Sequence, residues 1–148
     1  MYSIGARQVD QAVTEMVRVL VPHTDRDWQV PAGSLEWSCW QTGAHIAHDL
    51  AGYAGQLVAA PADGYLPMDL TVAAGTAPDQ VLRVAAACGG LLATAVAAAG
   101  PRVRGWHWGP TDRSGFAALG VNEILVHTHD ICAGLGVTWL PPAPLCVV

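Results

Sequence analysis

Apolar residues recur at helical spacing in four segments of the chain. In residues 6–20 they follow steps of three and four, charged residues occupy the opposite side, and Pro22 comes next. This spacing predicts an amphipathic helix that ends before the proline. Similar rows predict helices over residues 41–60, which Pro61 ends, over residues 77–99 and over residues 112–136. Thr42 is a candidate N-cap of the second helix, Pro78 suits the first turn of the third, and Gly136 suits the end of the fourth.

Outside these four segments we find no alternating pattern of the kind that predicts β-strands. The sequence therefore predicts an all-α fold, a four-helix bundle forming a single domain over residues 1–148. Its two long connections, residues 21–41 and 61–76, allow an order of helices other than simple up-and-down. Residues 137–148 contain three prolines and end on an apolar run, so we expect them to start a tail or a truncated further element.

All six tryptophans fall outside the predicted helices, at positions 28, 37, 40, 106, 108 and 139. Aromatic side chains gathered on connections commonly form the wall of a pocket. They can equally seal the ends of a bundle, and the sequence leaves both interpretations open.

Composition excludes several classes of protein. The net charge is −5, all seven basic residues are Arg, and they form no cluster, which argues against nucleic-acid binding. Residues 84–100 carry no charge, but this Ala-rich and Gly-rich run is shorter than the roughly 20 strongly apolar residues of a membrane span. The four cysteines form no C-x-x-C pair, and charged residues near the N-terminus argue against a signal peptide. These features favour a reduced, cytoplasmic protein.

The fourth predicted helix carries an acidic and imidazole stripe on its apolar side. Glu123, His127 and Asp130 are separated by four and three residues, so they share one face with Phe116 and Gly134. A charge buried without a partner is costly or shifts its pKa strongly. A metal ion, a salt-bridge partner or a catalytic pairing would each compensate this stripe, and a Glu123–His127 hydrogen bond within the helix is the simplest form of the second.

The second predicted helix supplies a candidate third ligand for a metal. His48 lies in a row of small residues that would leave room for a ligand, whereas His45, three residues earlier, falls beside Asp49. We therefore favour His48, with Glu123 and His127, over His45. Two imidazoles and one carboxylate with an open position are typical of catalytic Zn²⁺ sites, and Fe²⁺ or Ni²⁺ can use the same ligands.

Two motifs carry a resemblance to a known family. Trp40 is followed eight residues later by His48, and Glu123-x-x-x-His127-x-x-Asp130 is followed by Leu135-Gly136. Both motifs resemble the signatures of the DinB-like superfamily, and the branch most similar is the N-terminal domain of mycothiol-dependent maleylpyruvate isomerases. The resemblance implies a four-helix bundle of DinB-like type with His48, Glu123 and His127 as metal ligands. The sequence departs from the family at Gly120, where many members have Arg, and we find no counterpart of the isomerases' C-terminal domain within residues 1–148.

The resemblance further implies a reaction. Several members of the family use zinc to activate a low-molecular-weight thiol, so we expect a metal-dependent thiol S-transferase or isomerase that acts on an electrophilic small molecule, with mycothiol as a co-substrate. Asp130 would orient a ligand imidazole, His107 is a candidate acid or base at the pocket mouth, and Arg102 and Arg104 are candidates to hold the carboxylate of the thiol or an anionic substrate. We expect a monomer or homodimer. A metal–water hydrolase and a non-catalytic bundle that binds a small molecule or a protein partner are the alternatives.

Overall fold

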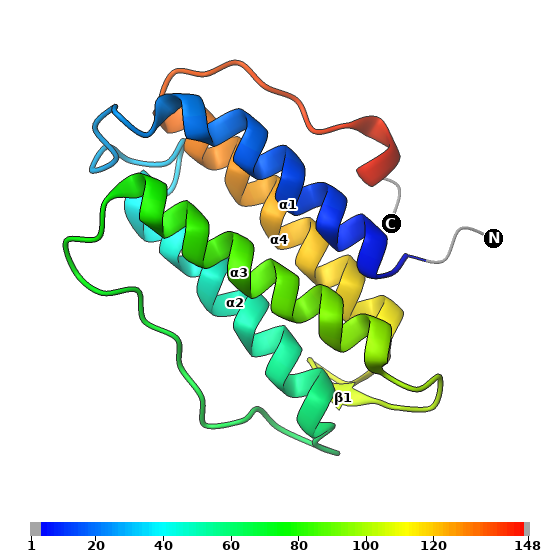
Figure 1. Ribbon diagram of the computed structural model, residues 1–148. Helices are drawn as coiled ribbons and strands as arrows, with labels where there is room; N and C mark the ends of the chain where they lie inside the picture. Colours follow the sequence, from blue (N-terminus) through cyan, green and yellow to red (C-terminus); the bar gives the residue numbers. More distant parts are fainter. Residues whose placement is uncertain (1–3, 147–148) are drawn as a thin grey trace.

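Four α-helices form a bundle in the computed structural model, which describes residues 4–146 (Figure 1). The helices are α1 Ala6–Leu20, α2 Cys39–Ala59, α3 Pro78–Ala98 and α4 Arg113–Gly134. Short 3-10 helices span Val21–His23 and Ala143–Leu145, and the two-residue strands β1 Gly105–Trp106 and β2 Pro110–Thr111 form a hairpin before α4. The predicted all-α fold is therefore confirmed, and the hairpin is an addition too short to leave a periodic signal in the sequence.

The helices are not arranged in simple up-and-down order. α2 packs against α3 and α4, and α1 packs against the other sides of α3 and α4, so that α1 and α2 lie at opposite corners of the bundle. α2 and α3 run in the same direction, as do α1 and α4 (Figure 1). Residues 24–38 and 60–77 must therefore cross the bundle or return along its length. This arrangement places α2 and α4 side by side and antiparallel.

Side chains at the ends of the helices account for where the helices begin and end. Ser38 caps α2 by accepting a hydrogen bond from Gln41 N, and the Gln41 side chain accepts one from Ser38 N in return. Thr42 as the predicted N-cap is therefore wrong, because the Ser38–Gln41 pair starts the helix earlier. Asp112 caps α4 by accepting from Gly115 N at 2.9 Å. Gly136 follows α4 with a left-handed φ of 71°, as its sequence context predicted.

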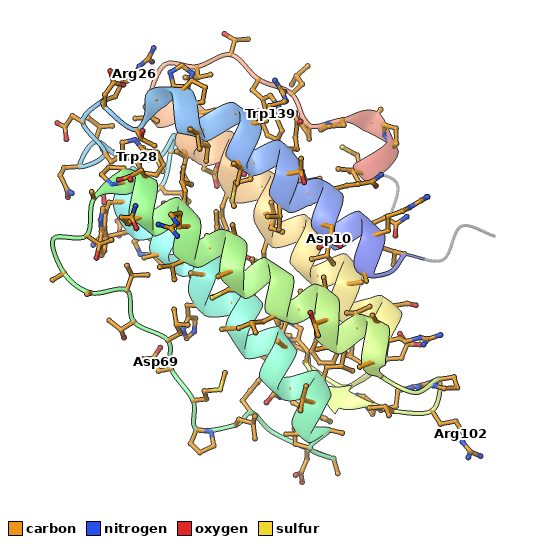
Figure 2. All side chains as sticks on the ribbon, in the orientation of Figure 1. Asp10, Arg26, Trp28, Asp69, Arg102 and Trp139 are labelled. Atoms are coloured by element: carbon orange, nitrogen blue, oxygen red, sulfur yellow. The ribbon has the colours of Figure 1, made fainter. Side chains whose placement is uncertain are left out.

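The tryptophans differ in where they lie and in what their ring nitrogens contact. Trp28 is buried beneath the connection between α1 and α2, where its Nε1 donates to His23 O at 3.0 Å (Figure 2). Trp40 lies in the first turn of α2, contrary to the prediction, and donates to Thr76 O at 2.7 Å. Trp139 donates to Glu15 Oε1 at 3.0 Å and so fastens the C-terminal tail to α1. These three residues tie connections to helix ends, as the sealing interpretation expects.

The tail after α4 folds back on the bundle as far as it is described. Leu145, in the last 3-10 helix, is buried. That residues 137–148 start a tail or a truncated element stays a prediction, and its last two residues, 147–148, lie outside the described part of the chain.

α3 is long and apolar enough to cross a membrane by length and composition alone. Half of its most apolar window is buried inside the protein, and the helix packs against α1 and α2. Its apolar composition is accounted for by this packing. All four cysteines are free thiols, and Cys39, Cys88 and Cys132 are buried as small apolar side chains.

The adjacent glycines of α3 offer a matched test of the helix packing. A Cβ added at Gly89 would collide with Val13 Cγ2 on α1, whereas one added at Gly90 would meet open space. Both Gly→Ala changes gain helix propensity, but only Gly89→Ala overpacks the interface. We expect Gly89→Ala to be about 1–3 kcal/mol less stable than Gly90→Ala in urea unfolding. Equal stability of the two variants would contradict the close approach of α1 and α3.

Candidate metal centre

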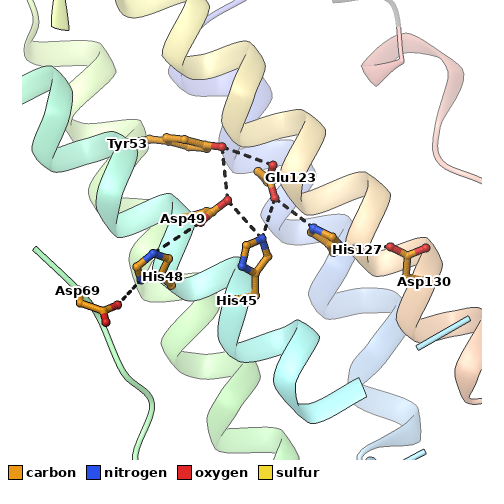
Figure 3. Close-up of polar contacts among 8 residues, drawn as sticks. All are labelled: His45, His48, Asp49, Tyr53, Asp69, Glu123, His127 and Asp130. Atoms are coloured by element: carbon orange, nitrogen blue, oxygen red, sulfur yellow. Dashed lines mark hydrogen bonds and ion pairs between the residues drawn. The ribbon is translucent and has the colours of Figure 1, made fainter. Parts of the chain in front are cut away.

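Two antiparallel helices each present an imidazole and a carboxylate at a spacing of four residues. α2 contributes His45 and Asp49, and α4 contributes Glu123 and His127 (Figure 3). The His45 and His127 rings meet edge to face with centroids 5.0 Å apart. The two carboxylates lie on the same side of them, because the Tyr53 hydroxyl is 3.5 Å from Asp49 Oδ2 and 3.4 Å from Glu123 Oε1. We call these five residues the polar cluster.

One oxygen lies at the centre of the polar cluster. Glu123 Oε2 is 3.5 Å from His45 Nε2 and 3.2 Å from His127 Nε2. It is buried and receives no hydrogen bond from any residue in the described part of the chain. A buried carboxylate oxygen without a donor is costly, so this atom calls for a cation or a proton between it and the imidazoles.

The three groups match the ligand set of a transition metal. One ligand atom from each of His45, Glu123 and His127 lies within 4.8 Å of the other two. Ligands held at the usual bond lengths to a tetrahedral Zn²⁺ are about 3.3–3.4 Å apart. Two of the three separations, at 3.2 and 3.5 Å, match this spacing, and the third, between the two imidazoles, is within 4.8 Å. The donor set of two nitrogens and one oxygen suits Zn²⁺ and leaves further coordination positions open.

Neighbouring side chains orient the three groups. Asp130 Oδ2 lies 3.0 Å from His127 Nδ1, one turn along α4, so the opposite ring nitrogen faces Glu123. This is the position in which a carboxylate fixes the tautomer of a metal-ligating histidine. On α2, Asp49 Oδ2 is 3.3 Å from His45 Nε2, the same ring nitrogen that faces Glu123. The Trp37 ring covers both imidazoles, with its centroid 4.6 Å from His45 and 6.5 Å from His127.

Burial and charge act in opposite directions on the cluster. Burial raises the pKa of Glu123, but the nearby imidazoles of His127 and then His45 more than offset it, so the net pKa is below the ordinary value. The Glu123 carboxylate in turn raises the pKa of His127 against the effect of burial. Burial raises the pKa of Asp49, and the charge of Glu123 adds to this. The site thus favours one cation between His127 and Glu123, either a proton or a metal ion.

His48, the third ligand that the sequence favoured, lies outside the cluster. Its Nδ1 is 2.9 Å from Asp69 Oδ1 and 3.3 Å from Leu70 N, both in the connection of residues 60–77, which we call the strap (Figure 3). His45, the rival, is the histidine that the structure brings together with Glu123 and His127.

The small residues of α2 explain this difference. Gly52 lines a hollow beneath the strap, and a Cβ at Gly55 would touch Met68 Cε of the strap at 3.0 Å. The row of small residues therefore marks the contact with the strap instead of the contact with α4. His48 follows this row, whereas His45, Asp49 and Tyr53 face α4. Packing also explains why position 120 is Gly where many members of the DinB-like superfamily have Arg. A Cβ at Gly120 would collide with Leu92 Cδ2, so an Arg side chain would not fit there.

The remaining predicted residues lie on or near the hairpin. His107 reaches the neighbourhood of the cluster, with its ring 5.3 Å from that of Tyr53. Arg104 donates to Pro101 O and Val103 O and is 3.9 Å from Asp112. Arg102 is exposed at the end of the bundle (Figure 2). Neither arginine lines the hollows that border His45, Asp49 and Tyr53.

Sequence reasoning missed three residues of the site, namely Asp49, Tyr53 and Trp37. A usable signal existed for two of them: His45-x-x-x-Asp49-x-x-x-Tyr53 repeats on α2 the four-residue spacing that drew attention to Glu123 and His127 on α4. Trp37 carries no such signal, because its position over the imidazoles depends on how the connection before α2 turns back.

The position of Trp37 gives a spectroscopic test of the site. A paramagnetic ion bound between the imidazoles would lie close to the Trp37 ring and quench its fluorescence. We expect Co²⁺ to quench the wild-type protein and Trp139→Phe to a similar extent, and Trp37→Phe much less. Trp139 is the control because it contacts Glu15 on α1 instead. Quenching that survives Trp37→Phe unchanged would place the ion elsewhere.

Comparisons with known proteins leave the chain without an assigned family: no family model, no curated protein and no solved structure matches it. The resemblance to the DinB-like superfamily therefore stays a prediction that rests on two sequence motifs. The geometry of the polar cluster is then the stronger guide to function.

Proposed function

We propose that the chain binds one divalent transition metal ion, Zn²⁺ before Fe²⁺ or Ni²⁺, through His45, Glu123 and His127. The observation that carries this is Glu123 Oε2, a buried oxygen without a donor among the described residues that lies between two imidazole nitrogens at the spacing of metal ligands. Three protein ligands leave a position for an exogenous group, as in catalytic sites.

We propose further that the site serves a thiol-dependent transferase or isomerase acting on an electrophilic small molecule. A bound divalent ion lowers the pKa of a coordinated thiol or water, so that a thiolate or hydroxide forms near neutral pH. The geometry supports the metal, and the resemblance to the mycothiol-dependent isomerases supports a low-molecular-weight thiol as co-substrate. Arg102 and Arg104 are not part of the proposal, because neither borders the cluster.

The surrounding residues have separate parts in this proposal. Asp130 holds the His127 ring by its Nδ1, and Trp37 covers the two imidazoles and limits the access of water. Asp49 Oδ2 is a carboxylate oxygen close to His45 that is not in the ligand set, so it is placed to accept the proton that a thiol gives up. The Tyr53 hydroxyl lies within reach of both carboxylates and donates to one of them at a time.

The choice between His45 and His48 provides the first test. We expect the untagged protein to bind about one equivalent of Zn²⁺ in calorimetry, His48→Gln to retain that binding, and His45→Gln to weaken it by about 100-fold or more, since a direct ligand exceeds the 10–100-fold of an outer one. Circular dichroism checks that both variants stay folded. Loss of binding in His48→Gln alone would reinstate the ligand set favoured by the sequence, and absence of binding in the wild type would refute the metal site.

A second test separates thiol chemistry from water chemistry. Addition of a small thiol such as N-acetylcysteine to the Co²⁺-loaded protein should produce a thiolate-to-cobalt charge-transfer band, because sulfur takes the open coordination position. His45→Gln should not show the band under the same conditions. If the wild-type spectrum is insensitive to the thiol while the metal stays bound, the thiol part of the proposal fails and a metal–water hydrolase takes its place.

A further inference from the structure

A hollow of about 150 Å³ lies beside the polar cluster, between α2 and the strap. We call it the side pocket. Its lining comes from three segments and includes Asp49, Gly52 and Tyr53 on α2, Tyr65 and Met68 on the strap, and His107 on the hairpin. The strap is held over it by backbone hydrogen bonds to the Gln56 side chain and by the contact of Asp69 with His48.

Flat and apolar side chains define the shape of the side pocket. The His107 ring stands perpendicular to both tyrosines, with its centroid 5.3 Å from Tyr53 and 5.8 Å from Tyr65. Tyr65 and Met68 keep about half of their surface exposed, at 51% and 46%, although they face a hollow. A space of about 150 Å³, with Met68, Leu70 and the faces of aromatic rings among polar groups in its lining, is large enough for one benzene ring. The pocket therefore suits a flat group of that size.

The side pocket opens onto the chemistry of the cluster. Asp49 and Tyr53 belong to both, and the Tyr53 hydroxyl is 3.4 Å from Glu123 Oε1. A molecule in the side pocket would therefore lie against the carboxylate side of the cluster.

The charges around the side pocket favour an uncharged occupant over an anionic one. The chain has no Lys, and none of its seven Arg lines the pocket. The acidic groups nearby are Asp49 in the lining and Asp69 on the strap beside His48. The imidazoles of His48 and His107 also line the pocket, and His48 already faces Asp69 at 2.9 Å. A carboxylate or phosphate placed there would meet the charge of Asp49 and find no Arg or Lys.

We propose that the side pocket binds a flat, uncharged, apolar group of about the size of benzene, carried by the electrophilic substrate. The identification of the occupant as part of a substrate rests on the proposed function. Its binding does not, because the pocket is formed by side chains that need no metal.

Gly52 offers a way to block the pocket without disturbing the fold. It lies on the pocket side of α2, and a Cβ added there meets no atom within 4 Å. A leucine at this position would extend into the hollow. Gly90 on α3 is the matched control, because it is also a helical glycine facing open space and does not line the side pocket.

Met68 supplies a local probe. We would follow the methyl signals of the ¹³C-methyl-methionine protein by NMR, in metal-free and Zn²⁺-loaded forms, with the Met68 signal assigned by Met68→Leu. We expect benzyl alcohol to shift the Met68 signal saturably in the wild type and in Gly90→Leu, while the signal of Met16, buried in the core, stays in place. In Gly52→Leu the apparent affinity for benzyl alcohol should fall by about tenfold or more. Benzoate has a similar shape but is anionic, and it should bind the metal-free wild-type protein at least about tenfold more weakly than benzyl alcohol does.

The outcomes separate this proposal from the proposed function. Absence of a saturable Met68 shift, equal binding to Gly52→Leu, or equal affinity for benzoate in the metal-free protein would each overturn the side-pocket proposal. If the Met68 signal shifts as expected but the protein binds no Zn²⁺, the side-pocket proposal is supported and the proposed metal site is refuted.

Discussion

The buried carboxylate of Glu123, held between the imidazoles of His45 and His127, is the interaction on which the rest of the structure depends. It lies between two helices that are distant in sequence, so both must be adjacent, antiparallel and in the correct register for the three groups to meet. The unusual order of helices provides the adjacency, because it places α1 and α2 at opposite corners and leaves α2 free to pack along α4. Gly120, which allows Leu92 and Leu50 to approach α4 closely, helps to fix the same region of the bundle.

The arrangement also sets apart the two carboxylates of the polar cluster, of which only Glu123 belongs to the candidate metal-binding triad. Asp49 and Glu123 are both partly buried, and Tyr53 bridges them with a single hydroxyl that can donate to only one at a time. Burial raises the pKa of Asp49 and the charge of Glu123 adds to this, whereas the imidazoles of His127 and His45 outweigh burial and hold the pKa of Glu123 below its ordinary value. Two chemically similar groups therefore acquire different tasks, with Glu123 suited to bind a cation and Asp49 suited to exchange a proton.

The sequence predicted the helices well because each is marked by physical signals that act locally. Apolar spacing located all four, and Pro22, Pro78 and Gly136 marked ends that the structure confirms. The position of Glu123 and His127 on one inward stripe was predictable for the same reason. The choice between His45 and His48 was not predictable. The row of small residues on α2 indicates that another segment approaches closely, but it does not tell whether that segment is a helix or a connection. Here the strap approaches, and only the tertiary structure shows this. Trp37 could not be placed at all, since its contact with the imidazoles arises from an irregular segment.

The strap has more chain than its path requires. α2 has 21 residues and is about 32 Å long, whereas residues 60–77 reach about 60 Å when fully extended. A connection between parallel neighbours must return along the whole bundle, so a long segment there is a requirement of topology before it is a requirement of chemistry. Its surplus length is free to vary in composition and shape while α2 and α4, which carry the ligands, stay unchanged. The strap supplies one wall of the side pocket through Tyr65 and Met68, and α2 supplies the other, so changes in the strap alter only the wall that is remote from the proposed ligands.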